Sequence, residues 1–145
     1  MTTTTTPPPN PKKESLHAPQ KSKGGPARLL AAARYSAAGL RAAVQHEAAF
    51  RQELALGLPM VAFALWLHPG RVQTLMLVGS VVLVWVVELL NSAIEALADA
   101  LSTEQHPLLG RAKDLGSAAV LLSLLLAAFI WAVLLWPMLI LSVGR

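Results

Sequence analysis

The sequence has no cysteine, and this absence excludes two kinds of structure. Without thiols the chain can form neither a disulfide framework nor a thiolate metal site. Aromatic residues are also few, at 6% of the chain, and Tyr35 is the only one before Phe50. The basic residues therefore lack the aromatic partners that are typical of nucleic-acid-binding surfaces, so we do not expect a nucleic acid as a partner.

Charge is scarce as well, because only 14% of the residues are charged and 54% are hydrophobic. Two long stretches, Val72–Val87 and Leu115–Val143, contain no charged residue. Helices of about 20 apolar residues cross the hydrocarbon core of a bilayer. We therefore predict two spans here, the second ending near Trp136, and a further span that begins near Phe50 and includes the shorter apolar run Leu54–Leu67. Trp66, Trp131 and Trp136 suit an aromatic belt at the outer interface.

The first part of the chain is basic and of low complexity. Residues 1–27 are rich in Thr, Pro and Lys, and we predict a disordered tail here, followed by a membrane domain over residues 28–145. Eight of the twelve Lys and Arg precede the first apolar segment. By the positive-inside rule the N-terminus is cytoplasmic, and after three crossings the C-terminus lies on the other side.

An alanine-rich run from Ala27 to Phe50 predicts an amphipathic helix that lies on the membrane surface. Arg34 and Arg41 are seven residues apart and share a face of this helix. That face suits phosphate, either of lipid headgroups or of a nucleotide. The predicted fold is thus an all-α integral membrane protein, with three transmembrane helices preceded by an amphipathic surface helix.

An acidic stretch at the end of the second span, Glu88–Asp99, is the most informative part of the sequence. Glu88, Asn91, Ser92, Glu95 and Asp99 fall within an arc of roughly 100° on one side of a helix. A carboxylate in or next to lipid costs at least ~2.5 kcal/mol unless it faces protein, water or a metal. Such side chains are therefore functional candidates.

Two further groups of charges are predicted to lie at the same membrane boundary. Glu47 and Arg51 are four residues apart, so they form either a helical ion pair or, through Glu47, part of a carboxylate cluster with Glu95. A polar loop over residues 102–110 is followed by Arg111, Lys113 and Asp114. Acidic and basic groups are thus expected together.

This combination favours phosphoryl transfer from a magnesium nucleotide. Carboxylates bind Mg²⁺, basic side chains bind phosphates, and Glu88 is placed to act as a base on a lipid hydroxyl. The chain contains neither a P-loop nor a Gly-x-Gly-x-x-Gly motif, so a nucleotide site of either kind is excluded.

Two other classes of protein remain open from the residues alone. A small transporter or channel subunit would use Glu88 to carry protons or cations, although the residue lies away from the midplane where transporter sites occur. A membrane anchor for a soluble partner would leave the acidic face without a role.

Three motifs in this order resemble the prokaryotic diacylglycerol kinase family: Glu47-Ala-Ala-Phe-Arg-Gln-Glu53, Glu88-Leu-Leu-Asn-Ser-Ala-Ile-Glu95 and Gly110-Arg-Ala-Lys-Asp114. The resemblance spans about residues 28–136. It implies a homotrimeric enzyme of the bacterial inner membrane, with a periplasmic C-terminus, that phosphorylates diacylglycerol with Mg²⁺ and ATP. His106-Pro107-Leu108 is instead similar to the related undecaprenol kinases, which leaves undecaprenol as an alternative substrate.

The resemblance also implies roles for individual residues. Glu88 corresponds to the catalytic base, Asn91 to a polar residue of the catalytic centre, and Glu47 and Glu95 to the metal-binding carboxylates, which also contact the nucleotide. The other nucleotide contacts are Arg28, Tyr35, Glu104, Gln105, His106, Lys113 and Asp114. The lipid contacts are Ala49, Phe50, Arg51, Gln52, Glu53, Glu88 and Ser117.

Overall fold

The computed structural model describes residues 25–102 and 106–143, with side chains described as far as Trp136. This part of the chain forms four helices, α1 (Pro26–His46), α2 (Ala48–Leu67), α3 (Arg71–Leu101) and α4 (Pro107–Val143), and contains no strand. The chain divides into two compact units, Met1–Ser36 and Ala37–Arg145, and the second holds α2, α3 and α4. The predicted all-α class is confirmed.

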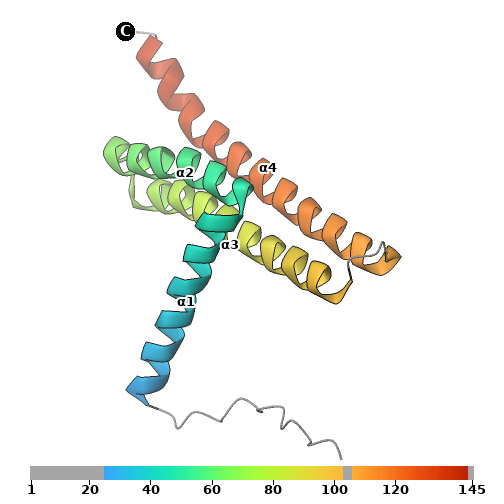
Figure 1. The fold of residues 1–145 in the computed structure, drawn as a ribbon. Coiled ribbons are helices and arrows are strands. Elements are labelled where there is room, and N and C mark those ends of the chain that lie inside the picture. The colour runs from blue at the N-terminus through green and yellow to red at the C-terminus, as the bar shows by residue number, and fades with distance from the viewer. Residues whose placement is uncertain (1–24, 103–105, 144–145) are drawn as a thin grey trace, which may run out of the picture. The chain divides into compact units, whose positions relative to one another are not determined.

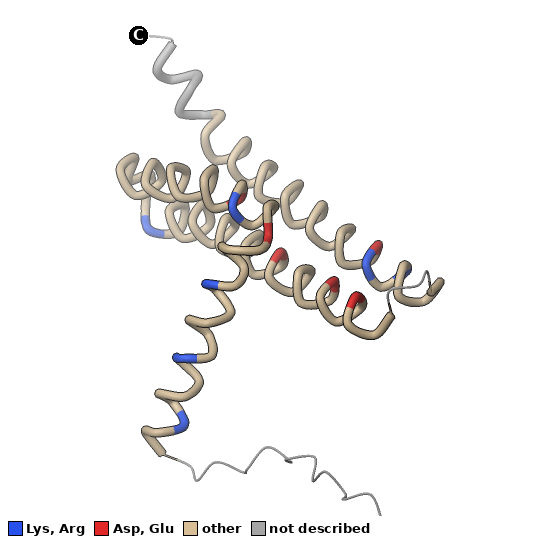
Figure 2. Tube along the Cα trace, viewed as in Figure 1, with Lys and Arg blue, Asp and Glu red and all other residues tan. Residues whose placement is uncertain are grey.

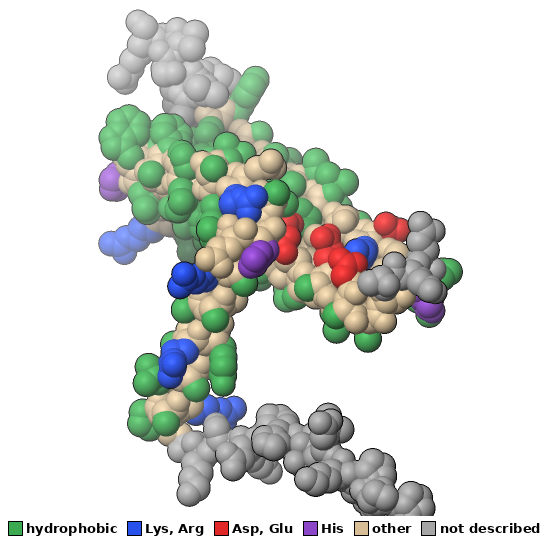
Figure 3. Space-filling model, in the orientation of Figure 1, with side chains coloured by type: hydrophobic (Ala, Val, Ile, Leu, Met, Phe, Trp, Pro, Cys, Tyr) green, Lys and Arg blue, Asp and Glu red, His purple; other side chains and the backbone are tan. Residues whose placement is uncertain are grey.

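Three of the helices are long and apolar enough to cross a membrane, which confirms the number of predicted spans. The 20 residues of α2 extend about 30 Å at 1.5 Å per residue, close to the thickness of a hydrocarbon core. The 31 residues of α3 extend about 46 Å, which is longer than such a core is thick. Large apolar side chains cover much of the surface, as a lipid environment requires (Figure 3).

The central helix is α3, which packs against both α2 and α4 (Figure 1). The core between these helices contains Ala64, Leu77, Val81 and Trp131. Trp131 is buried, and its Nε1–H lies 3.3 Å from the Leu77 carbonyl oxygen and 3.2 Å from the Ser80 hydroxyl oxygen. Its prediction as a residue of an aromatic belt is therefore wrong, because α3 supplies acceptors for its indole. Trp66 and Trp136 are exposed, and their place in an aromatic belt stays a prediction.

The junction between α1 and α2 is formed by Glu47, whose backbone is extended at φ −97° and ψ 112°. Arg51, one turn into α2, donates from Nη1 to the carbonyl oxygens of Val44 and Gln45 at 3.3 and 3.2 Å. These carbonyls belong to the last turn of α1, where backbone acceptors lack helical partners. Arg51 thus caps α1, and the ion pair with Glu47 that the spacing allowed is not formed.

The connection from α2 to α3 is a tight turn at residues 68–70. His68 adopts a left-handed conformation at φ 47°, and Gly70 lies at φ 130° and ψ 157°, a region that is open essentially to glycine alone. This turn lets α3 begin at Arg71 and run back beside α2, as the sequence predicted.

Both ends of α4 differ from the prediction. The helix begins at Pro107, within the segment predicted as a loop, because proline suits the first helical position and His106 Nδ1 accepts the Leu108 N–H at 3.3 Å. It continues through Pro137 to Val143 rather than ending near Trp136. Membrane helices tolerate proline, since an irregular segment in lipid would leave backbone groups unsatisfied.

Candidate active site

Glu88 lies on α3 and is only 4% exposed. The charges of Glu95 and Glu47 act on Glu88, and the charge of Glu88 in turn acts on Glu53 of α2. One buried carboxylate thus interacts electrostatically with three others, from α2, α3 and the α1–α2 junction. We call these four residues the acidic cluster. Packing like charges around a buried acid destabilises a fold, and such arrangements are typical of functional sites.

Helix periodicity explains why α3 contributes several groups to this region. Glu88, Asn91 and Glu95 are separated by three and four residues and lie one above the other. Figure 2 shows the acidic residues of α3 along the half of the helix that leads to the α3–α4 connection. The predicted acidic face is therefore formed, although Asp99, at its end, is exposed.

Asn91 is a buried amide of α3 that contacts the acidic cluster. It is 8% exposed, and its Nδ2 donates a hydrogen bond to Glu95 Oε1 at 2.9 Å. Its other polar atom, Oδ1, is buried and has no hydrogen-bond partner among the described residues. Asn91 therefore orients the Glu95 carboxylate, and its Oδ1 accepts no hydrogen bond from the described residues.

Lys113 forms the ion pair that joins the end of α3 to the start of α4. Its Nζ lies 2.6 Å from Asp99 Oδ1, and the charge of Glu95 also acts on it. A cation is thus held at the edge of the acidic cluster. Sequence reasoning placed Asp99 on the acidic face but gave it no partner.

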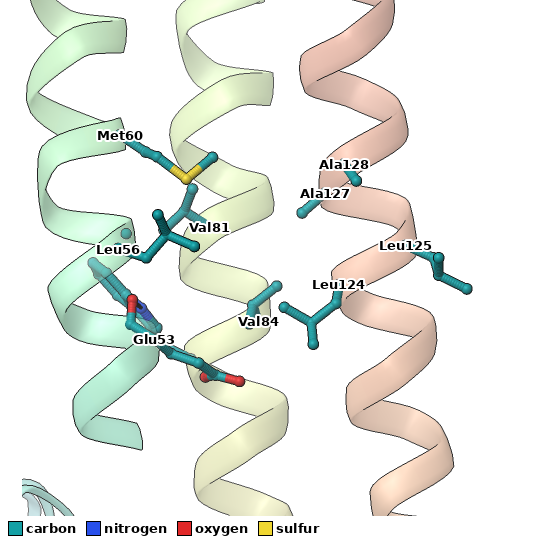
Figure 4. Close-up of a pocket in the computed structure, with 11 residues that line it drawn as sticks. Glu53, Leu56, Met60, Val81, Val84, Leu124, Leu125, Ala127 and Ala128 are labelled. Carbon is teal, nitrogen blue, oxygen red and sulfur yellow. Dashed lines mark hydrogen bonds between the residues drawn. The ribbon is translucent and has the colours of Figure 1, made fainter. Parts of the chain in front are cut away.

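A cavity of about 370 Å³ opens between α2, α3 and α4 (Figure 4). Its walls are apolar, and Glu53 is the one charged residue among the described residues that line it. Glu53 Oε2 is buried without a hydrogen-bond partner in the described part of the chain. The cavity therefore joins an apolar space to a carboxylate that interacts with Glu88.

Gly57 and Trp85 shape this cavity. A Cβ atom at Gly57 would lie 2.7 Å from Cζ2 of Trp85 and 2.8 Å from Cγ1 of Val81, so only glycine leaves room for the indole. Trp85 Nε1 donates to the backbone oxygen of Glu53 at 3.2 Å. Sequence reasoning missed this pair, and a glycine inside a membrane helix was the available signal.

The remaining candidate residues are distributed as follows. Phe50 is buried at 2% exposure, whereas Ala49, Arg51, Gln52, Asp114, Ser117 and His106 are exposed. Arg28 and Tyr35 are exposed on α1, within the unit Met1–Ser36. Glu104, Gln105 and most of the predicted tail lie outside the described residues. The roles predicted for all these residues stay predictions.

Residues 25–102 and 106–143 contain no group of three or more His, Asp or Glu side chains that could hold a metal by themselves. Magnesium rarely needs such a cage, because it commonly takes one or two carboxylates together with water and substrate phosphates. The charges of Glu47 and Glu95 both act on Glu88, so these two carboxylates are the candidate ligands. This oxygen-only donor set fits Mg²⁺ bound together with a phosphate ligand.

Comparison with known proteins decides the family. A model of the family described as prokaryotic diacylglycerol kinase matches residues 34–135, more than half of the chain. The chain belongs to this family. The match includes every member of the acidic cluster, Lys113 and Tyr35, whereas Arg28 lies outside it.

Several curated relatives of this family are similar over most of their length. The diacylglycerol kinase of Escherichia coli K12 is 51% identical over 109 residues, which cover 75% of this chain and 89% of the relative. That of Pseudomonas aeruginosa is 43% identical over 117 residues, covering 81% and 95%. That of Haemophilus influenzae is 39% identical over 103 residues, covering 71% and 87%. The resemblance seen in the motifs is thereby confirmed.

Membership of the prokaryotic diacylglycerol kinase family makes this chain a lipid kinase. The three apolar helices agree with a bacterial membrane protein. The transporter and anchor alternatives are set aside, because the family and its relatives are kinases.

Proposed function

We propose that this protein transfers the γ-phosphate of ATP, bound with Mg²⁺, to the free hydroxyl of diacylglycerol and so forms phosphatidic acid. The observation that carries the proposal is the buried position of Glu88 within the acidic cluster. The names of the relatives support diacylglycerol as the lipid.

The depth of Glu88 suits a lipid substrate. It follows Arg71 by 17 residues, about 26 Å along α3 at 1.5 Å per residue, near the end of a hydrocarbon core of about 30 Å. The hydroxyl of a membrane lipid lies at this level. A base at the bilayer midplane would not reach it.

In the proposed reaction Glu88 acts as the general base. Its carboxylate accepts the proton of the lipid hydroxyl while the hydroxyl oxygen forms a bond to the γ-phosphorus. The bond between this phosphorus and the β–γ bridging oxygen breaks, and ADP leaves. Proton transfer to a positioned base contributes roughly 10²- to 10⁴-fold to such a rate.

Glu47 and Glu95 are the residues that we propose hold Mg²⁺. The ion, when bound, neutralises charge on the transferred phosphoryl group. Asn91 fixes the orientation of Glu95, and Lys113 offers its ammonium group to phosphate oxygens from the edge of the cluster. The further proposed nucleotide contacts are Arg28, Tyr35, Glu104, Gln105, His106 and Asp114.

On the lipid side we propose that residues 49–53 and Ser117 contact the substrate, with Glu53 hydrogen-bonded to its glycerol part. The apolar cavity that Glu53 lines gives an acyl chain a space continuous with this carboxylate. A chain in that space would keep water from Glu88 during transfer.

We further propose that the enzyme works as a homotrimer in the bacterial inner membrane, with the active site on the cytoplasmic side. The basic N-terminal segment supports this orientation. Cysteine labelling from either side of sealed vesicles tests it, because a cysteine in the N-terminal segment should react only from the cytoplasmic side.

Transfer of labelled γ-phosphate to two lipids in parallel tests the proposed function. We expect dioleoylglycerol to be phosphorylated much faster than undecaprenol in mixed micelles that contain MgATP. Faster phosphorylation of undecaprenol would mean that the proposed site is right and that undecaprenol is the substrate. Transfer to neither lipid would contradict the proposed function.

A further inference from the structure

Gly116 of α4 packs directly against Asn91 on the polar side of α3. A Cβ atom built on it would collide with Oδ1 of Asn91 and would also lie 3.3 Å from its Cγ and 3.8 Å from its Cα. Gly79 on α3 and Gly110 on α4 have nothing within 4 Å of an added Cβ. Position 116 therefore requires glycine because a side chain there would meet Asn91, and not because of an unusual backbone conformation.

Asn91 cannot easily move away from an added methyl group. It is 8% exposed, and its Nδ2 is bonded to Glu95 Oε1. Displacing Oδ1 would turn the amide plane and break this bond, which would leave polar atoms unpaired in a buried place. Adding a methyl group at Gly116 would therefore disturb the orientation of the Glu95 carboxylate.

We propose that Gly116 is a positioning residue of this kinase. Its missing side chain lets Asn91 stand against α4 and hold the Glu95 carboxylate in the orientation that serves the metal. The inference rests on the proposed role of Glu95 and goes beyond it by assigning the support of that ligand to α4. Gly116 acts through Asn91 and contacts no reacting atom.

If Gly116 served only to form the helix, Gly116→Ala would have a different effect. Alanine forms helices better than glycine, so Gly116→Ala would be neutral or stabilising if the site only had to be helical. A positioning role predicts instead that the Mg²⁺ concentration for half-maximal activity rises roughly tenfold or more, the usual effect of disturbing a group that orients a metal ligand. Gly79→Ala is the matched control and should leave this concentration unchanged.

Spectra of the metal-free protein give a readout that does not depend on activity. In ¹H–¹⁵N spectra of the full chain in micelles, the Asn91 side-chain amide signals should shift in Gly116→Ala and stay in place in Gly79→Ala. Because no lipid or nucleotide is present, this result stands even if the proposed function fails. Unmoved Asn91 signals together with an unchanged Mg²⁺ requirement would overturn the inference.

A pair of variants tests the same link without relying on the folding of Gly116→Ala. Asn91→Ala removes the crowded side chain, so adding Gly116→Ala to it should change the Mg²⁺ requirement less than about twofold, because coupled residues are not additive. A further large loss in the double variant would show that Gly116 acts elsewhere and would overturn the inference.

Discussion

Lys113 Nζ lies 2.6 Å from Asp99 Oδ1, and this ion pair joins the start of α4 to the end of α3 beside the acidic cluster. The two side chains are 38% and 69% exposed, so water screens the pair and its contribution to stability is small. The ion pair holds the ammonium group of Lys113 near Glu95.

Asp99→Asn should therefore raise KM for ATP with little change in stability. We expect an increase of about fivefold, because the Lys113 ammonium group is then no longer held near Glu95. Initial rates over a range of MgATP measure it, and Lys113→Gln is expected to lose more because the phosphate contact itself is removed. A lowered KM would mean that Asp99 competes with the nucleotide.

Glu95→Gln should raise the Mg²⁺ concentration that gives half-maximal activity, because an amide is a poorer ligand than a carboxylate. Changing a residue that hydrogen-bonds to a metal ligand costs about 10- to 100-fold in metal affinity, and loss of the ligand itself should cost at least as much. Titration of activity with Mg²⁺ after chelation measures the shift. An unchanged Mg²⁺ requirement would exclude Glu95 as a ligand.

Gly57→Ala should destabilise the protein by about 1–3 kcal/mol, because the added methyl group collides with Trp85 in a packed interface. Thermal unfolding in detergent measures the loss. Trp85→Leu should restore part of it by making room, and Gly79→Ala, with open space around it, should be neutral or stabilising. Equal effects at Gly57 and Gly79 would contradict the packing.

Trp131→Phe should cost about 1–2 kcal/mol, because it removes the indole N–H that bonds to Leu77 and Ser80 on α3. Trp136→Phe serves as the control, since its side chain is 66% exposed and its loss removes no described contact to α3. The two variants compared by thermal unfolding separate a core tryptophan from an interfacial one.

Much of the fold and part of the site could be predicted from the sequence. Long uncharged stretches determine the membrane helices, and helix periodicity places Glu88, Asn91 and Glu95 on one face. The contact of Gly116 with Asn91 could not be predicted, because the register of two packed helices depends on side chains from both. For the same reason Trp131 was assigned to the interface, since its acceptors lie about fifty residues earlier in the chain.

Turnover of Glu88→Gln tests the central claim most directly. The substitution keeps the volume of the side chain and removes the base, so kcat for dioleoylglycerol should fall by roughly 10²- to 10⁴-fold. Folding and ATP binding, followed by thermal unfolding and nucleotide protection, should be retained. Activity above about a tenth of the parent, on a scale where each tenfold is ~1.4 kcal/mol of barrier, would contradict the assignment of Glu88 as the catalytic base.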